Sequence, residues 1–188
     1  MELRDWLHPL NYLAADLQAE FDARGGRFSK VYILVFHTGF HLVVLVRLQS
    51  FLRRVPTIGP ALARVLFMIT SLLRGCEISP ASVIGPGFRV GHPLGIVVGS
   101  DVRAGRNLAV MHHATIGGRR NVSSPHPAVQ SIGDNVVVGT GAILLGDIVV
   151  GSHAVIGAQA LVLDDVPEHG VVVGNKGRAI SKKQNHDS

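Results

Sequence analysis

An aliphatic residue returns at every sixth position through most of the second half of the chain, and glycine often follows it. A period of six fits neither the 3.6-residue repeat of a helix nor the two-residue alternation of a strand. It is typical of a parallel β-helix, in which three hexapeptides form one triangular coil and residues about eighteen apart stack. We therefore predict a solenoid over residues 76–180. The repeating positions are Ile78, Ile84, Val90, Ile96, Val102, Leu108 and Ala114, then Ile132, Val138, Leu144, Val150, Ile156 and Val162.

The repeat is interrupted once, between Ala114 and Ile132. These residues are eighteen positions apart, one full coil, so the pattern predicts that the chain keeps its phase across the interruption. Residues 117–131 carry no repeat and are rich in turn-forming glycine, serine, asparagine and proline. We predict a loop extruded from the prism, and a loop on a rigid scaffold is a common place for functional residues. A tolerated insertion without a function is the alternative interpretation.

Residues 1–75 show helical periodicity instead. Helices are predicted over 11–23, over 30–54 with Ser29 as N-cap, and over 61–73 with Gly75 as terminator. The apolar stretch 31–46 is shorter than the roughly 20 residues that a membrane-spanning helix needs. Two roles remain open for this half: capping the end of the solenoid, and peripheral membrane contact through an apolar face with arginines nearby. The polar tail, residues 181–188, gives no functional signal.

Composition narrows the class of protein. The chain has 188 residues, 47% of them hydrophobic, and 22 glycines, which suits a turn-rich repeat unit joined to a small helical part. The single cysteine, Cys76, excludes an intramolecular disulfide, and no signal peptide is evident, so we expect a cytoplasmic protein. Aromatic residues, 5% of the chain, are too few for nucleic-acid stacking. The net charge of +5 therefore fits an anionic cofactor or a lipid surface better than nucleic acid.

The candidate chemistry rests on histidines, because the sequence has no serine or cysteine nucleophile motif and no phosphate-binding loop. His92 follows Gly91 at an expected corner, and Glu77 lies fifteen residues earlier, about one coil away on the same face. A carboxylate in hydrogen-bond reach would orient the imidazole so that its other nitrogen takes a proton from a hydroxyl. A solvated corner histidine is the alternative. No two solenoid histidines are a multiple of eighteen apart, so none is expected to stack and a metal site is disfavoured.

Several short motifs, taken in order, resemble the catalytic half of bacterial serine O-acetyltransferases, within the hexapeptide acyltransferase family. They are the run 91–99 (GHPLGIVVG), the run 114–118 (ATIGG), His126 with Pro127, the run 166–169 (VPEH), and Gly174 with Arg178. The resemblance implies a mainly β fold, a left-handed parallel β-helix preceded by an α-helical N-terminal region. It also implies acetyl-CoA as co-substrate, no metal, and a homotrimer with active sites between neighbouring solenoids.

The resemblance also implies roles for particular residues. His92 would be the general base, Glu77 its orienting carboxylate, and His126, in the extruded loop, a second active-site histidine that stabilises developing charge. The acceptor hydroxyl would attack the thioester carbonyl of acetyl-CoA directly, without an acyl-enzyme. Backbone amides around four small residues would line the pantetheine groove, and basic residues would meet the CoA phosphates. The small residues are Gly117, Gly118, Ala142 and Ala160, and the basic residues are Lys176 and Arg178, with Arg119 and Arg120.

Two departures from the serine enzymes concern the acceptor. Where those enzymes carry an aspartate before the base and an arginine before the second histidine, this chain carries Gly91 and Pro125. Each missing charge removes a charge-assisted bond to an amino-acid zwitterion, worth about 1.5 to 3 kcal/mol. His113 is a further candidate for the acceptor groove, with a solvated corner position as the alternative.

The short helical region also resembles the acetyltransferases of exopolysaccharide and capsule pathways, such as the colanic acid enzyme. We therefore predict an acetyl-CoA-dependent O-acetyltransferase that modifies a sugar hydroxyl of a polysaccharide intermediate. Serine O-acetyltransferase is the alternative. A third interpretation is a metal-dependent hydratase or a non-catalytic binding scaffold on the same solenoid. A position at the inner face of the membrane would suit the apolar and basic N-terminal half.

Overall fold

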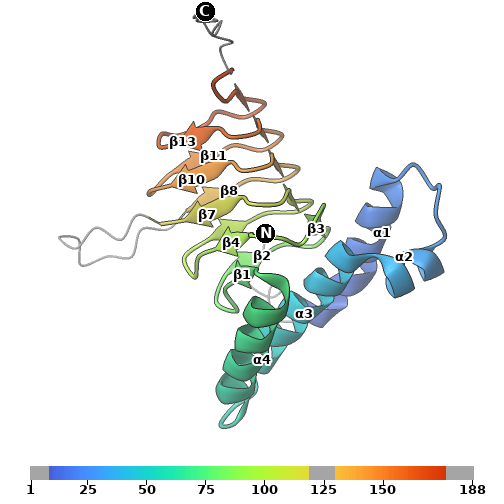
Figure 1. The fold of residues 1–188 in the computed structure, drawn as a ribbon. Coiled ribbons are helices and arrows are strands. Elements are labelled where there is room, and N and C mark those ends of the chain that lie inside the picture. Colours follow the sequence, from blue (N-terminus) through green and yellow to red (C-terminus); the bar gives the residue numbers. More distant parts are fainter. Residues whose placement is uncertain (1–8, 119–129, 177–188) are drawn as a thin grey trace, which may run out of the picture.

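The computed structural model describes residues 9–118 and 130–176, and in this part of the chain the helices precede the strands (Figure 1). The helices are the 3-10 helix η2 (Pro9–Tyr12), then α1 (Leu13–Ala23), α2 (Lys30–Phe36), α3 (Thr38–Leu52) and α4 (Gly59–Arg74). The first seven strands are β1 (Glu77–Ile78), β2 (Val83–Ile84), β3 (Arg89–Val90), β4 (Val97–Val98), β5 (Arg103–Ala104), β6 (Ala109–Val110) and β7 (Thr115–Gly117). The remaining strands are β8 (Ser131–Ile132), β9 (Val137–Val138), β10 (Ile143–Leu145), β11 (Val149–Val150), β12 (Val155–Ile156), β13 (Leu161–Val162) and β14 (Val171–Val172).

The strands form three parallel sheets, which are the three faces of a prism. One face has the order β1-β4-β7-β10-β13, the second β11-β8-β5-β2, and the third β14-β12-β9-β6-β3. From β1 to β13 successive strands along the chain belong to successive faces, so each complete turn adds one strand to every sheet. Figure 1 shows these coils stacked from the helices toward the C-terminal end. The predicted parallel β-helix is therefore present.

The coils differ in length, which corrects the predicted phase of the repeat. Glu77 pairs with Val97, twenty positions on, and Val97 with Thr115, eighteen positions on. The first coil is longer because its corner at residues 91–96 holds two extra residues. From there the strand residue that points inward is Val98 rather than Ile96. The apolar pattern of the sequence did not reveal this shift, because Ile96, directly before β4, is buried as well.

The coil that contains the interruption is also longer than the predicted eighteen residues. Thr115 pairs with Ile143, twenty-eight positions on, so Ala114 is equivalent to Ala142 and not to Ile132. The repeat ends with Gly117 in β7 and resumes at Gln130, which is buried, so this coil has ten residues more than the one before it. Most of the predicted loop 117–131 lies outside the described residues.

The helical half agrees with the predicted elements except at one break. Ser29 caps α2 by accepting a hydrogen bond from Tyr32 N, and Gly75 ends α4 with a left-handed φ of 60°. The predicted helix over 30–54 is instead two helices, α2 and α3, that meet at 76°. His37 makes the break, because its backbone is extended and its Nδ1 accepts from Phe40 N as the N-cap of α3. In the described residues no single helix has the length and apolarity to cross a membrane, and only this bent pair reaches them together.

A buried ion pair joins the helices to the first coil. Arg47 of α3 donates to both carboxylate oxygens of Asp16 in α1, at 2.9 and 3.0 Å, and the two side chains are 4% and 0% exposed. Arg47 also donates to the carbonyls of Ile84 and Gly85, while Asp16 accepts from the amides of Gly87 and Phe88. Every polar atom of the pair thus has a partner, which a buried ion pair requires. The pair holds α1 and α3 against the base of the solenoid.

Candidate active site

The candidate site lies at the corner where β3 ends and β4 begins. His92 is the second residue after β3, and its side chain is exposed. The carbonyl of His92 accepts from Leu94 N at 2.9 Å, which tightens the turn, and Gly95 N donates to Gly75 at the end of α4. The corner therefore lies directly above the junction between the helical half and the solenoid. This geometry leaves the imidazole of the predicted general base open to solvent and substrate.

Three histidines gather at this corner, one coil apart. The ring centroids of His92 and His112 are 5.5 Å apart with an edge-to-face angle of 77°, and those of His112 and His113 are also 5.5 Å apart. The expectation that no two solenoid histidines stack is wrong, because the longer first coil places His112 above His92. His153 and His169 in the last coils stack as well, at 4.9 Å, because that coil is shorter than eighteen residues.

Stacking does not make a metal site. In residues 9–118 and 130–176, no three His, Cys, Asp or Glu side chains are grouped so that they could hold a metal ion. Around the rings of His92, His112 and His113, no carboxylate completes a ligand set in this part of the chain. The hydratase alternative therefore gains nothing from the histidine stacks.

Glu77 lies on β1, in the face that starts directly above α4. Its carboxylate is exposed and accepts from the Ser71 hydroxyl of α4 at 3.3 Å. Among the described residues, neither Glu77 nor another carboxylate forms a hydrogen bond or ion pair with His92. Both members of the predicted dyad thus belong to the first coil, Glu77 on its first strand and His92 at its last corner, but the carboxylate is turned to Ser71. Sequence spacing could not identify Ser71 as the partner, because its helix belongs to the other half of the molecule.

Backbone conformation at the corner depends on a glycine. Gly95 has a φ of 64°, and a Cβ there would overlap Nδ1 of His113, which itself has a φ of 59°. His113 N donates to Leu94 O at 2.8 Å, so the two coils are joined through this turn. His113 is exposed at the corner, which places it where a groove-lining residue would lie. Its contact with substrate remains a prediction.

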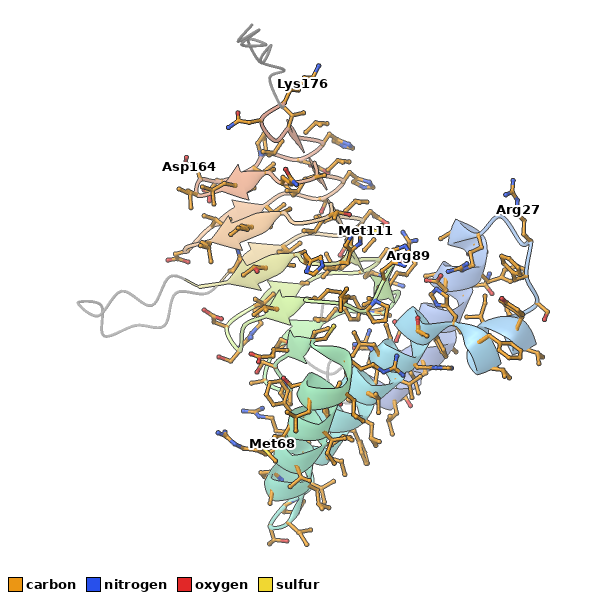
Figure 2. All side chains as sticks on the ribbon, viewed as in Figure 1. Arg27, Met68, Arg89, Met111, Asp164 and Lys176 are labelled. Atoms are coloured by element: carbon orange, nitrogen blue, oxygen red, sulfur yellow. The ribbon has the colours of Figure 1, made fainter. Side chains whose placement is uncertain are left out.

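Gly91, the first predicted departure, faces the next coil. A Cβ at Gly91 would lie 2.6 Å from Sδ of Met111, so the thioether occupies the space that a side chain at position 91 would need. Figure 2 shows Met111 and Arg89, from neighbouring coils, on this side of the solenoid. The position next to His92, the predicted base, is therefore apolar, with sulfur near the place where the resemblance to the serine enzymes would imply a carboxylate. Pro125 and His126 lie outside the described residues.

The start of α3 closes one side of the corner, which the sequence did not predict. A Cβ at Gly39 would overlap the carbonyl oxygen of Val90, so the first turn of α3 rests on the end of β3. His37 is near enough to His92 for the two charges to interact, and burial lowers the pKa of His37 below its ordinary 6.5. Glu20, 3.4 Å from Nε2 of His37, opposes that shift, while Arg24, His41 and His92 add to it.

The predicted cofactor residues lie on one face of the prism. Gly117 ends β7, and nothing lies near the Cβ position there, so the backbone is open to an approaching ligand. Ala142 and Ala160 are buried in the prism, and their amides already donate to Gly139 and Gly157. Those two amides are therefore used within the coils, so any contact there would come from the outward residues that follow them, Ile143 and Leu161.

Of two further residues predicted to bind the cofactor, Gly118 lies beside that face and Lys176 lies near its end. Gly118 is half-buried directly after β7, and Lys176 is exposed beyond the last strand, as Figure 2 shows. Arg178, Arg119 and Arg120 lie outside the described residues. A phosphate-binding role for Lys176 thus remains a prediction.

The prism, its three-faced coils and the hexapeptide pattern define the class as a transferase of the hexapeptide-repeat type. Residues 131–164 match the family model described as bacterial transferase hexapeptide (six repeats). Across a much longer stretch, 180 residues are 34% identical to a serine acetyltransferase of Bacillus pumilus, covering 93% of this chain and 80% of that protein.

Solved structures agree with this match. A serine acetyltransferase of Entamoeba histolytica, in complex with cysteine, superposes with a TM-score of 0.80 at 25% identity over 93% of this chain. One of Brucella abortus, in complex with coenzyme A, gives 0.79 at 29% identity over 89% of this chain. This chain spans 61% and 66% of the lengths of those two structures. The chain belongs to the serine acetyltransferase family of acyltransferases, and its solenoid is a left-handed parallel β-helix.

Proposed function

We propose that this chain is an acetyl-CoA-dependent O-acetyltransferase, with L-serine as the first candidate acceptor. The observation that carries the proposal is the exposed His92 imidazole at a solenoid corner, in a chain whose reported relatives are serine acetyltransferases. The complex of the Brucella abortus relative with coenzyme A supports the choice of cofactor. These comparisons favour serine over the saccharide that the sequence pattern favoured.

The proposed reaction needs only one proton-transfer group on the enzyme. The unprotonated imidazole nitrogen of His92 takes the proton of the acceptor hydroxyl as its oxygen attacks the thioester carbonyl. The resulting tetrahedral oxyanion collapses, the carbon–sulfur bond breaks, and the CoA thiolate leaves with the proton from His92. Glu77 would orient the imidazole after turning from Ser71, and His126 would stabilise the oxyanion. His112, whose ring edge lies against His92, limits the orientations that the base can adopt.

A hydroxyl without a zwitterion, such as that of a sugar, is the second candidate acceptor. The observation that favours it is the Gly91 position, where Met111 sulfur takes the place of a carboxylate. At that position an ammonium group would meet the Met111 sulfur instead of a carboxylate. Desolvating an unpaired ammonium group is costly.

We further propose a homotrimer of solenoids in the cytoplasm, with the cofactor bound between neighbours. One face carries the outward apolar residues Val97 of β4, Ile143 of β10 and Leu161 of β13, which would suit packing against a second solenoid. Gly117, Gly118, Lys176 and Arg178 would bind CoA. Membrane contact is a separate proposal, because it concerns a different surface, on α4.

The test is thiol release from acetyl-CoA by the purified protein. L-serine is compared with a panel of sugars and nucleotide sugars. His92→Ala should lower the rate by about 10² to 10⁴ without weakening CoA binding. The matched control is His153→Asn, which changes another corner histidine and keeps a residue that tolerates its φ of 63°. A fully active His92→Ala variant would remove His92 as the base.

Two further results separate the finer claims. Glu77→Gln should slow the reaction less than His92→Ala does, and an unchanged rate would mean that another group orients the imidazole. Saturable turnover with serine would establish the first acceptor, while turnover with a saccharide alone would establish the second. In the latter case Gly91→Asp with Met111→Ala, which opens the space for a carboxylate, should raise turnover with serine.

A further inference from the structure

One face of α4 is apolar and exposed along its whole length. The residues recur at helical spacing, three or four positions apart, from the residue before the helix to its last turn. Leu72 and Leu73 are 78% and 77% exposed, which is unusual for leucine. The side chains are Ile58, Leu62, Val65, Met68, Ile69, Leu72 and Leu73. Figure 2 shows Met68, one of these residues, on the part of α4 that extends beyond the solenoid. A continuous apolar face of this kind marks an interaction surface.

Positive charge borders this face and negative charge is missing from its helix. Between residues 53 and 76 the chain has four arginines and no aspartate or glutamate: Arg53, Arg54, Arg64 and Arg74. Arg53 and Arg64 line a cavity of about 420 Å³ between α4 and the first coils, together with the hydroxyl residues Ser79 and Ser100. The face thus combines apolar side chains with guanidinium groups at its margin.

The opposite face of α4 is fixed to the protein. Ala63 and Thr70 are buried against α3, and the Thr70 hydroxyl accepts from Gln49 at 2.9 Å. The exposed face therefore cannot turn inward without breaking this packing. With sixteen residues the helix is about 24 Å long, less than the roughly 30 Å of a bilayer core. A helix of this length with one apolar face is suited to lie in a membrane surface rather than to cross it.

We propose that α4 is a membrane-binding helix, which lies in the headgroup region of an anionic bilayer with its apolar face in the acyl boundary. Arg53, Arg54 and Arg64 would meet lipid phosphates. Charge complementarity favours a membrane over a second copy of the chain. Two such faces packed together would bring the arginine margins of both copies into contact without a carboxylate on either helix. This proposal does not depend on which acceptor the enzyme uses.

The test is co-sedimentation of the full-length protein with vesicles. Phosphatidylcholine vesicles are compared with vesicles in which about one third of the lipid is phosphatidylglycerol. We expect binding to the anionic vesicles that weakens as the salt is raised from about 0.05 M to about 0.5 M. The triple variant Val65→Ser, Ile69→Ser and Leu72→Ser should lower partitioning by about tenfold or more. Arg53→Gln with Arg64→Gln should remove the preference for anionic lipid.

The matched control replaces three equally exposed apolar residues of the last coils: Leu163→Ser, Val171→Ser and Val173→Ser. This variant should bind vesicles as the parent does. Light scattering of each variant without lipid provides a second measurement. The proposal is overturned if the parent stays in the supernatant with both kinds of vesicle, or if the control and α4 variants lose binding equally. It is also overturned if the α4 variant binds vesicles normally but loses its oligomeric state, because the face is then an interface between copies.

Discussion

The solenoid and the helical half are stabilised in different ways. Between coils the same backbone bond recurs: Val97 N donates to Ala114 O, Thr115 N to Ala142 O, and Ile143 N to Ala160 O. Each coil therefore contacts only its neighbours, and the loss of one contact is shared along the stack. The helices have no such repeat. They are joined to the first coil by a few particular contacts: apolar residues of α3 in the shared core, and the buried ion pair of Asp16 with Arg47, which is bonded to the backbone of that coil.

The regular half of this fold and the half that a single substitution can destabilise are therefore different parts of the molecule. A repeat distributes its stability over many equivalent bonds, whereas an anchor concentrates it in a few groups that must all be satisfied. The candidate site lies where the two halves meet: His92 comes from a coil, Ser71 from α4, and His37 from the break between α2 and α3. Perturbing the anchor should therefore affect the site as well as the stability.

The largest expected effect comes from breaking the anchor. Asp16→Asn leaves the Arg47 guanidinium buried without its counter-charge, which costs about 3 to 5 kcal/mol of the free energy of unfolding. Urea unfolding followed by circular dichroism measures it. The control is Asp22→Asn, the same substitution on the same helix at an exposed position, which should change the stability by less than about 0.5 kcal/mol. Equal effects of the two substitutions would show that the pair is not an anchor.

Much of the solenoid was predictable from the sequence, because its rule is local and repeats. The six-residue period identified the fold and most of the inward residues, from Ile78 to Val162. The period failed where a coil holds extra residues, at the corner of His92 and at the insertion after Gly117. A buried residue precedes each of the strands β1 to β13, so a shift of two positions leaves the apolar pattern almost unchanged. Coil length is set by turn geometry, which periodicity does not report.

The candidate site was less predictable, because its neighbours come from distant parts of the chain. His92 and Glu77 were found from their spacing, but spacing could not show that Ser71 holds the carboxylate or that Met111 fills the space beside Gly91. The break at His37 also had no proline to mark it. It follows from packing of Gly39 on the carbonyl of Val90, a contact across more than fifty residues.

A smaller effect is expected at the histidine corner, where a glycine allows two coils to touch. Gly95→Ala combines a strained φ of 64° with an overlap on His113, and we expect a loss of about 2 to 3 kcal/mol. Gly141→Ala, at the equivalent corner two coils on, has a similar φ of 66° but an ordinary 3.5 Å contact with Gln159. It should lose only about 1 kcal/mol. The difference between the two variants in urea unfolding isolates the overlap, and no difference would mean that His113 moves freely aside.

The smallest effect concerns pH and the helix that closes the site. Burial lowers the pKa of His37 below its ordinary 6.5, so between the folded pKa and 6.5 the unfolded chain binds a proton that the folded chain does not. Stability is therefore fully present above pH 6.5 and falls as the pH is lowered through the folded pKa. His37→Asn keeps a side chain that can cap α3 but does not titrate, so its Tm should fall less between pH 7.5 and 5, by on the order of 2 °C.

The groups that face His37 determine how this result is interpreted. Glu20 favours the protonated imidazole, whereas Arg24, His41 and His92 oppose it, so the net shift is a balance that burial decides. Titration of the His37 ring proton by NMR gives an independent measurement, and its midpoint should lie below 6.5. A midpoint at or above 6.5, or the same slope of Tm against pH in the parent and the variant, would contradict the argument. In that case Glu20 outweighs burial, and the start of α3 carries a positive charge beside His92 at neutral pH.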